Sequence, residues 1–396
     1  MSVISYTLHK CKKCMRCLKT CPTGAITIQQ ERAIISPKKC INCGLCMNSC
    51  KNLGLQAKGS TIVDKDNYDY SIILVPTSIY SDCSTMHEVE TLQAAIAKLG
   101  FNEVVNLSDI EGAVYAKAKK YTEQDTSKLF ISSFCPVVNR LIEKKYPMLL
   151  SNMIPFDYPA EIAAANLRKK LEPDHKSIGI FLLCECPSKL SLPKYPYGRD
   201  RSAIDHALSI VDLFPQINSL RGENTLPVEL CADGIKSVVS GSEVSIDDKI
   251  LFVDGLDKIQ KVLELAEFGL LKDIRLLSLS ACTNGCIGGQ FIWGNSFNGK
   301  INMYSLHKSA KLPMTDLSMS QLYGEETAEN IEGLPNIFEQ LKKFKAVNDQ
   351  LEVLPGFDCG ACGLPTCRSM AEEIVEGKRN LKDCRILGKR DQDESQ

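Results

Sequence analysis

Two copies of one cysteine pattern open the chain, and they constrain its fold more than any other feature. Each copy holds four cysteines separated by two, two and three residues. They are Cys11, Cys14, Cys17 and Cys21 in the first copy, and Cys40, Cys43, Cys46 and Cys50 in the second. Neither a disulfide scaffold nor a zinc site requires a third cysteine at this spacing, twice over. The pattern therefore favours a different kind of metal centre.

Thiolates at this spacing are typical of iron–sulfur cubes, in which the fourth cysteine of each run ligates the other cluster. We predict one 4Fe–4S cluster on Cys11, Cys14, Cys17 and Cys50, and a second on Cys40, Cys43, Cys46 and Cys21. The segment resembles the bacterial two-cluster ferredoxins. Residues 1–60 are therefore expected to form a ferredoxin domain that carries electrons.

Composition narrows the class of protein further. The 396 residues have a formal net charge of −1, so nucleic acid is not an expected partner. No apolar run approaches the length of a membrane span, and the early basic residues do not fit a secretory signal. Most of the nineteen cysteines are grouped, which indicates metal in a reducing compartment. We expect a soluble cytoplasmic protein of an organism that tolerates little oxygen.

The charge is unevenly distributed along the chain. Residues 1–60 hold eight lysines and two arginines against one acid, a net charge of +9 before any cluster is counted. A solvated basic face is one interpretation. The other is a docking patch for an acidic ferredoxin or another redox protein, which would be attracted by charge. No P-loop or Rossmann fingerprint occurs, so a direct NAD site is not expected.

From residue 70, short apolar runs alternate with helical patterns, as they do in βαβ units. Strands are expected at residues 70–76, 103–107, 128–133, 177–183, 249–253 and 274–280. Helices are expected at residues 86–99, 109–121, from 137 onward, and at 259–270. These elements predict an α/β domain over residues 61–350, with a mixed, mostly parallel sheet and helices on both of its faces.

Four further cysteines follow the predicted strands directly. Cys135 and Cys186 each come just after a strand, and Cys282 and Cys286 come just after the strand at 274–280. Open α/β sheets build their sites at the carboxyl ends of strands, so these four thiols are expected to converge and to ligate one cube. Cys83 and Cys231 stand alone, and we expect them to be buried packing residues.

The last part of the chain has its own cysteine set. Cys359, Cys362, Cys367 and Cys384 lie among Gly360, Gly363 and Pro365, which allow tight turns around a cluster. We predict a third 4Fe–4S site in a C-terminal domain over residues 351–396, with zinc as the alternative. The segment resembles the iron–sulfur domain of corrinoid-linked and membrane electron-transfer proteins.

The central cysteines and their neighbours resemble the FeFe-hydrogenase family. Its first signature corresponds to SSFCPVVNRLIEKKYP around Cys135, its second to CECPSK with Cys186 and Lys189, and its third to ACTNGCIGGQ with Cys282 and Cys286. A C-terminal cluster domain on a short chain resembles the sensory group of that family. The resemblance implies a central hydrogenase-like domain that acts on H2.

The resemblance also implies roles for individual residues. Cys286 would bridge the cube to a diiron subsite, forming the H-cluster, and Lys189 would hydrogen-bond a cyanide ligand of that subsite. Cys184 stands where relatives have Met, and it is either a small packing residue or a thiol that relays protons. The resemblance implies that Val75, Pro76, Ser280 and Phe134 border the cofactor.

The chain departs from the family pattern along the proton path. The residue before the first cube ligand is a proton-relaying cysteine in the family, but here it is Phe134, which carries no proton. The family's acidic relay pair is not recognisable around residues 109–120. Because positioned proton transfer contributes roughly 10²–10⁴-fold to a rate, this loss predicts a slow enzyme or a sensor.

Three functions remain open at this point. The first is a slow or sensory hydrogenase with three 4Fe–4S clusters and an H-cluster. The second is an electron-transfer protein with four plain 4Fe–4S clusters and no hydrogenase activity. The third is a redox subunit acting on another small substrate at a changed cluster.

Overall fold

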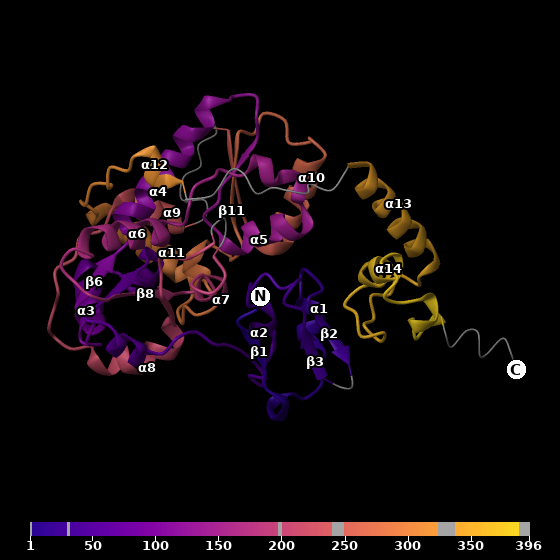
Figure 1. Ribbon diagram of the computed structural model, residues 1–396, viewed down its shortest axis with the longest axis horizontal. Helices are drawn as coiled ribbons and strands as arrows, with labels where there is room; N and C mark the ends of the chain where they lie inside the picture. Colours follow the sequence, from indigo (N-terminus) through magenta and orange to yellow (C-terminus); the bar gives the residue numbers. More distant parts are fainter. Residues whose placement is uncertain (1, 30–31, 197–199, 240–248, 324–336, 388–396) are drawn as a thin grey trace, which may run out of the picture. The chain divides into compact units, whose positions relative to one another are not determined.

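A computed structural model describes residues 2–29, 32–196, 200–239, 249–323 and 337–387 (Figure 1). It divides into two compact units. Residues 1–57 and 331–396 make up the first unit, and residues 58–330 make up the second. The two ends of the chain thus belong to one unit, although more than 270 residues separate them in the sequence.

The N-terminal part of the first unit is built from two antiparallel strand pairs and two short helices. Strand β1 (Ile4–Tyr6) pairs with β4 (Leu55–Ala57), and β2 (Ile26–Gln29) pairs with β3 (Arg32–Ile35). Helices α1 (Arg16–Thr20) and α2 (Leu45–Ser49) each follow the first cysteines of one run. A small apolar core lies between these elements, and it consists of Val3, Ile4, Ile26, Ala33, Cys46 and Leu55.

The repeat in the sequence is also a repeat in the backbone. Lys13 and Asn42 occupy equivalent positions in the two runs, and their φ angles are 55° and 53°. Met15 and Gly44, which precede the two helices, have φ angles of 59° and 78°. Left-handed residues turn the chain sharply, so each run curls its cysteines around one point.

The C-terminal part of the first unit contains two helices. Helix α13 (Ile337–Val353) packs against α14 (Cys367–Val375). Their shared core consists of Val347, Leu354, Leu364, Met370, Ala371 and Cys384. Helix α13 therefore extends across residue 350, the boundary expected from the sequence, and associates with the C-terminal residues.

The second unit contains two separate parallel sheets. The first has the order β6 (Glu103–Asn106), β5 (Tyr70–Val75), β8 (Ile178–Cys184), β9 (His206–Ser209). The second has the order β10 (Ile250–Asp254), β11 (Leu276–Ser280), β7 (Phe130–Ile131). The predicted α/β class is confirmed, but the expectation of one mixed sheet is wrong. Every pairing between described strands of this unit is parallel, and the strands fall into two groups.

The described part of the second unit contains the four predicted helices, α3, α4, α5 and α10, and six that were not predicted (Figure 1). Together they are α3 (Met86–Ala97), α4 (Ser108–Tyr121), α5 (Pro136–Lys145), α6 (Pro159–Leu171), α7 (Pro187–Leu190), α8 (Ile210–Leu220), α9 (Ala232–Val238), α10 (Leu256–Glu267), α11 (Ser296–Ser309) and α12 (Met319–Leu322). Thr85 caps α3 by accepting the Glu88 N–H, as a helix N-cap should. Strand β9 was not predicted as a strand. Within the described ranges, no helix combines the length and apolar character needed to cross a membrane.

Candidate functional site

The ferredoxin-like part holds two cavities, each lined by four cysteines. Cys11, Cys14, Cys17 and Cys50 line the first cavity. Cys21, Cys40, Cys43 and Cys46 line the second. The structure thus brings together the same two sets that the spacing predicts, including the exchange of the fourth cysteine between the runs.

Backbone amides are aimed at the thiols in the same way in both runs. The amides of Lys13 and Asn42 donate to the Sγ atoms of Cys11 and Cys40, at 3.3 and 3.4 Å. The amides of Ala25 and Gly54 donate to the Sγ atoms of Cys21 and Cys50, at 3.2 and 3.3 Å. Hydrogen bonds to cluster sulfurs are one means by which a protein sets a reduction potential. The two cavities therefore share equivalent backbone donors to their cysteines.

Burial favours the neutral, protonated form of these thiols. It raises the pKa of Cys17 to about 11 and that of Cys43 to about 12, with neighbouring cysteine charges adding to the shift. A buried thiolate is thus unfavourable unless a nearby cation offsets its charge. Metal ions deprotonate a coordinating thiol outright, so iron would satisfy these cavities and the residues fit a cluster.

A third cavity lies in the C-terminal part. It is lined by Cys359, Cys362, Cys367 and Cys384, together with apolar residues such as Leu354 and Met370. Gly360 and Gly363 have φ angles of 76° and 82°, which other residues rarely adopt. The predicted turns at these two glycines are confirmed. The guanidinium of Arg379 donates to the Cys362 carbonyl at 2.9 Å and supports the loop.

The four central cysteines converge from both sheets of the second unit. Cys135 precedes α5 after β7, and Cys186 precedes α7 after β8. Cys282 and Cys286 follow β11. Burial raises the pKa of Cys186 to about 12 and raises the pKa values of Cys282 and Cys286, and the Cys135 charge adds to all three shifts. These three thiols therefore lie close enough to Cys135 for its charge to act on them, and that all four ligate one cube stays a prediction.

Beside Cys286 lies a buried cavity with two charged side chains. Its lining includes Cys286, Lys189, Glu111, Phe134 and Pro76. Further lining residues are Leu107, Tyr158, Pro159, Ala160, Leu192, Ser237 and Val238. The cavity is therefore a mainly apolar space with an ammonium and a carboxyl group at its wall.

Lys189 is held by a carboxylate that the sequence analysis did not consider. Its Nζ lies 2.5 Å from Oε1 of Glu185, whose side chain is 1% exposed. The other oxygen of Glu185 has no hydrogen-bond partner among the described residues. Negative charge on Glu185 raises the pKa of Lys189 well above its usual value, against the opposing effect of burial. Lys189 therefore stays charged beside the cavity.

Glu111 is a second buried carboxyl group that the sequence patterns did not single out. It lies in the first turn of α4, and its Oε2 accepts the Thr77 N–H at 3.1 Å. Burial raises its pKa to about 7, although Lys189 partly opposes the shift. The available signal was its position just after strand β6, because the carboxyl ends of strands form the site.

The other predicted residues lie outside the cavity lining. Cys184 is fully buried, and its Sγ lies 3.5 Å from the Leu182 carbonyl oxygen. Val75 is fully buried at the end of β5. The Ser280 carbonyl accepts the Gly255 N–H at 3.0 Å, at the end of β11. Of the residues expected to border a cofactor, Pro76 and Phe134 do line the cavity.

Two cysteines outside the four sets behave as packing residues. Cys83 and Cys231 are 1% and 2% exposed, so the expectation that they are buried is confirmed. Among the described residues, no three His, Cys, Asp or Glu side chains are spaced for a single metal ion. A four-iron cube binds one thiolate at each iron, so its ligands are spaced more widely than those of one ion.

Three family models match separate parts of the chain. A model for the C-terminal domain of the iron-only hydrogenase large subunit matches residues 77–221. A 4Fe–4S dicluster model matches residues 10–53, and a model named FeS, for an Fe–S cluster domain, matches residues 354–386. The hydrogenase match includes Cys135 and Cys186 but ends before Cys282 and Cys286.

Comparisons with individual proteins give more distant likenesses. The uncharacterized ferredoxin-like protein YdhY of Escherichia coli K12 is 39% identical over 51 residues, which are 12% of this chain and 24% of that protein. A variant of FeFe-hydrogenase HydA1 from Chlamydomonas reinhardtii is 14% identical with a TM-score of 0.46, over 60% of this chain and 83% of that one. A HydA structure described for stepwise H-cluster assembly is 13% identical with a TM-score of 0.45, over 75% and 90%.

Proposed function

Since this chain is a divergent FeFe-hydrogenase-like iron–sulfur protein with ferredoxin-like and C-terminal iron–sulfur domains, we propose that it is a slow or sensory hydrogenase. It would interconvert H2 with protons and electrons at the centre formed by Cys135, Cys186, Cys282 and Cys286. The other three cysteine sets would hold 4Fe–4S clusters that carry the electrons.

The observation that supports this proposal is the cavity beside Cys286. A plain cube needs four thiolates and no adjoining space lined by charged groups. Burying an ammonium and a carboxyl group is costly unless partners or a ligand compensate them. The Lys189 ammonium at the wall of this cavity fits a small anionic group bound next to Cys286, as a diiron subsite with cyanide ligands would be, and Glu111 is compatible with such a group in its protonated form.

The residues around the cavity would each contribute a separate effect. A diiron subsite, when bound, would supply the metal chemistry that cleaves or forms H2. Lys189 would donate a hydrogen bond from Nζ to an anionic ligand, and Glu185 would orient that ammonium. Glu111 can hold or release a proton on its carboxyl oxygen near neutral pH, because its pKa is about 7. Phe134 would exclude water from the wall.

Phe134 also accounts for the low rate that we propose. It is half-buried, lines the cavity and packs near Tyr115, with ring centroids 6.2 Å apart. An aromatic ring cannot accept or pass a proton, so protons must reach the cavity by another route. Glu111 is the titratable carboxyl group on that wall, and we propose that it serves a slower route.

The second candidate is an electron-transfer protein with a plain cube at the central cysteines. One observation favours it: the Lys189 ammonium is already paired with Glu185, so it does not require a ligand in the cavity. In this case the chain would hold four 4Fe–4S clusters and would not turn over H2.

Infrared spectroscopy separates the two functions. The full chain is produced anaerobically with and without FeFe-hydrogenase maturation proteins. Bands from CO and cyanide ligands, appearing only after maturation, would support the hydrogenase, and iron should then be about eighteen per chain. About sixteen irons without such bands would establish the electron-transfer alternative. The Cys286→Ala variant is the control, because it removes the proposed bridging ligand.

The location and partners follow from the same chemistry. We propose a cytoplasmic location in an anaerobic organism, because sixteen thiols must stay reduced to bind iron. H2 would be the small substrate. An acidic ferredoxin or another redox protein would dock on the ferredoxin-like part, where Lys12, Lys13 and Arg16 are exposed at the lining of the first cavity.

A further inference from the structure

The ferredoxin-like part and the C-terminal part of the first unit contact each other through backbone and side-chain atoms. The Ile28 N–H of strand β2 donates to the Gly363 carbonyl at 3.2 Å. A Cβ atom at Gly363 would lie 2.8 Å from the Ile28 carbonyl oxygen, closer than real Cβ contacts allow. The loop of the C-terminal cysteine set therefore lies directly against β2, and glycine is needed for this approach.

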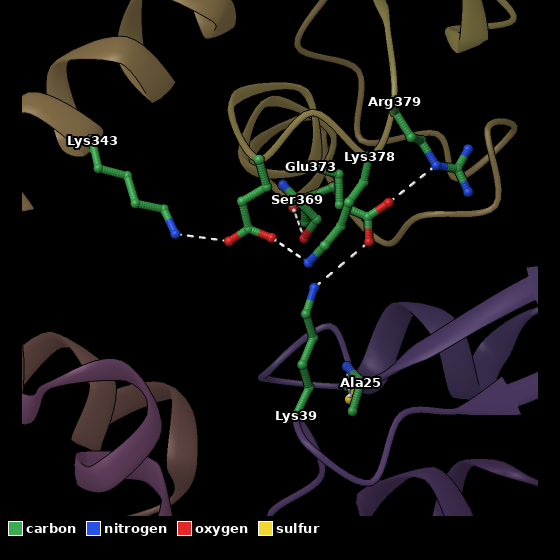
Figure 2. Close-up of polar contacts among 10 residues, drawn as sticks. Ala25, Lys39, Lys343, Ser369, Glu373, Lys378 and Arg379 are labelled. Atoms are coloured by element: carbon green, nitrogen blue, oxygen red, sulfur yellow. Dashed lines mark hydrogen bonds and ion pairs between the residues drawn. The ribbon is translucent and has the colours of Figure 1, made fainter.

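Charged side chains reinforce this contact, as Figure 2 shows. Lys39 lies 3.6 Å from one carboxylate oxygen of Glu373, and Arg379 donates to the other at 3.1 Å. The Glu373 side chain is 14% exposed and the Lys39 side chain is 37% exposed, so the carboxylate of this pair is partly shielded from solvent. Arg379 also binds the Cys362 carbonyl at 2.9 Å. These ion pairs and hydrogen bonds thus connect the ferredoxin-like part to the loop of the C-terminal cysteine set.

A thin layer of side chains separates the first and third cavities. A Cβ atom at Gly360 would lie 3.3 Å from Leu18 and 3.7 Å from Met15. Met15 and Ile28 line the first cavity, and Gly360 lines the third. The residues that enclose one cysteine set therefore contact the residues that enclose the other.

We propose that residues 354–387 are a built-in redox partner of the ferredoxin-like part, docked on β2 and Leu18. The docking would hold the site at Cys359, Cys362, Cys367 and Cys384 beside the site at Cys11, Cys14, Cys17 and Cys50, so that the two exchange electrons directly. The exchange moves one electron and no atoms: one site is oxidised as the other is reduced. It does not depend on whether the central site turns over H2.

Electron paramagnetic resonance of the reduced full chain tests this proposal. Two adjacent reduced clusters broaden each other's signals. The two ferredoxin-like clusters broaden each other, and we expect additional broadening from the third site that is lost in the Cys362→Ser, Cys367→Ser variant, which lacks the third ligand set but keeps the ferredoxin-like sites. If the signals of the remaining clusters are the same with and without the third set, the proposed adjacency is wrong.

A wedge in the contact gives a second test that retains all ligands. The Ser369 hydroxyl lies 3.4 Å from a Cβ atom placed at Gly24, so Ser369→Trp should force the two parts away from each other. The matched control is Arg368→Trp, at the neighbouring exposed position of α14. We expect the broadening to fall in the first variant and to persist in the control. Equal broadening in both variants would contradict the docking.

Hydrogen exchange keeps the proposal testable if the wedge variant loses iron. The Ile28 amide is protected by Gly363, so Ser369→Trp should speed exchange in the β2 peptide while Arg368→Trp should not. Lys39→Glu should weaken the contact in the same assay, whereas Lys39→Arg, which keeps the positive charge opposite Glu373, should retain it. The Lys51→Glu control makes the same charge change at another exposed lysine of the ferredoxin-like part. Unchanged β2 exchange in both Ser369→Trp and Lys39→Glu would overturn the proposal.

Discussion

At the scale of single residues, two buried carboxyl groups near Lys189 have different surroundings. Glu185 is in contact with the Lys189 ammonium, which compensates the charge of its buried carboxylate. Glu111 accepts one backbone N–H and lies further from compensating charge, so burial raises its pKa to about 7. Glu185 is therefore suited to orient a cation, and Glu111 is suited to hold a proton.

The pKa of Glu111 makes a pH-dependent contribution to stability. Its pKa in the folded chain is about 7, above the ordinary value of 4.5, so the folded chain retains a proton that the unfolded chain has lost. Its stabilising effect is complete below pH 4.5 and is lost as the pH rises through about 7. As the pH rises from below 4.5 to above 7, the free energy of unfolding of the wild-type chain should fall by about 3 kcal/mol relative to that of the Glu111→Gln variant.

Urea unfolding of the two chains between pH 5 and 7.5 measures this loss. The glutamine retains an oxygen that can accept the Thr77 N–H, so packing changes little. Taking the difference between the two chains cancels contributions from other titrating groups. A difference that does not vary with pH would show that Glu111 is ionised throughout.

Breaking the Lys189–Glu185 pair should be costly. Lys189→Met leaves the buried Glu185 carboxylate without its cation, and such a loss costs about 3–5 kcal/mol of the free energy of unfolding. The double variant with Glu185→Gln should recover much of that loss. The control is Lys258→Met, which breaks an exposed pair with Asp254 and should cost less than about 1 kcal/mol. Equal effects at Lys189 and Lys258 in urea unfolding would contradict a buried pair.

At the scale of elements, the close packing of α4 on α9 positions Glu111. A Cβ atom at Gly234 in α9 would lie 2.0 Å from the Ser108 carbonyl oxygen at the start of α4. Cys231, which precedes α9, donates its N–H to the Ser108 hydroxyl at 3.0 Å. The first turn of α4, which carries Glu111, thus depends on a glycine in a neighbouring helix.

Gly234→Ala should therefore disturb the cavity as well as the packing. Overpacking of this kind costs about 1–3 kcal/mol, and we expect this loss in urea unfolding. Gly222→Ala is the control, because nothing lies within 4 Å of a Cβ atom at that position. If Gly234→Ala is as stable as Gly222→Ala, the two helices can separate without loss, and their packing does not determine the position of Glu111.

At the scale of the whole molecule, positive charge surrounds one rim of the first cavity. Lys12, Lys13 and Arg16 are exposed there, and Cys14 is exposed between them. Lys39 instead contributes to the internal contact with Glu373. The basic residues of the N-terminal part therefore fall into two groups. Lys39 contacts the C-terminal part, and the residues at the rim of the first cavity are exposed to solvent.

Reversing the charge of this rim should slow electron exchange with an acidic ferredoxin. We expect the triple variant Lys12→Glu, Lys13→Glu, Arg16→Glu to lose about tenfold or more in rate at low salt. The wild-type rate should fall as salt rises, because exposed charges are screened within about 10 Å at 0.1 M. The control reverses Lys261, Lys272 and Lys311, exposed residues of the second unit. Stopped-flow rates equal in both variants would place the dock elsewhere.

Much of this molecule could be predicted from the sequence because its ligands are close along the chain. Within each ferredoxin-like run, the first three cysteines are close enough along the chain to reach one cluster, and the fourth joins the set of the other run. The predicted strands at residues 70–76, 177–183 and 274–280 correspond to β5, β8 and β11, because continuous apolar runs are typical of buried parallel strands. Cysteines that follow such strands could then be expected near the carboxyl ends of the strands, although these strands belong to two sheets.

Other features were decided only by the tertiary structure, because they join residues that no local pattern connects. Helix packing places Glu111 in the cavity of Cys286, and a buried carboxylate, Glu185, holds Lys189. The grouping of strands into two sheets and the contact of Gly363 with β2 likewise depend on long-range packing. The sequence by itself determined which atoms can bind iron, since chain spacing limits their reach. Tertiary packing decided which charges and which cysteine sets lie side by side, since that depends on the free energy of the whole fold.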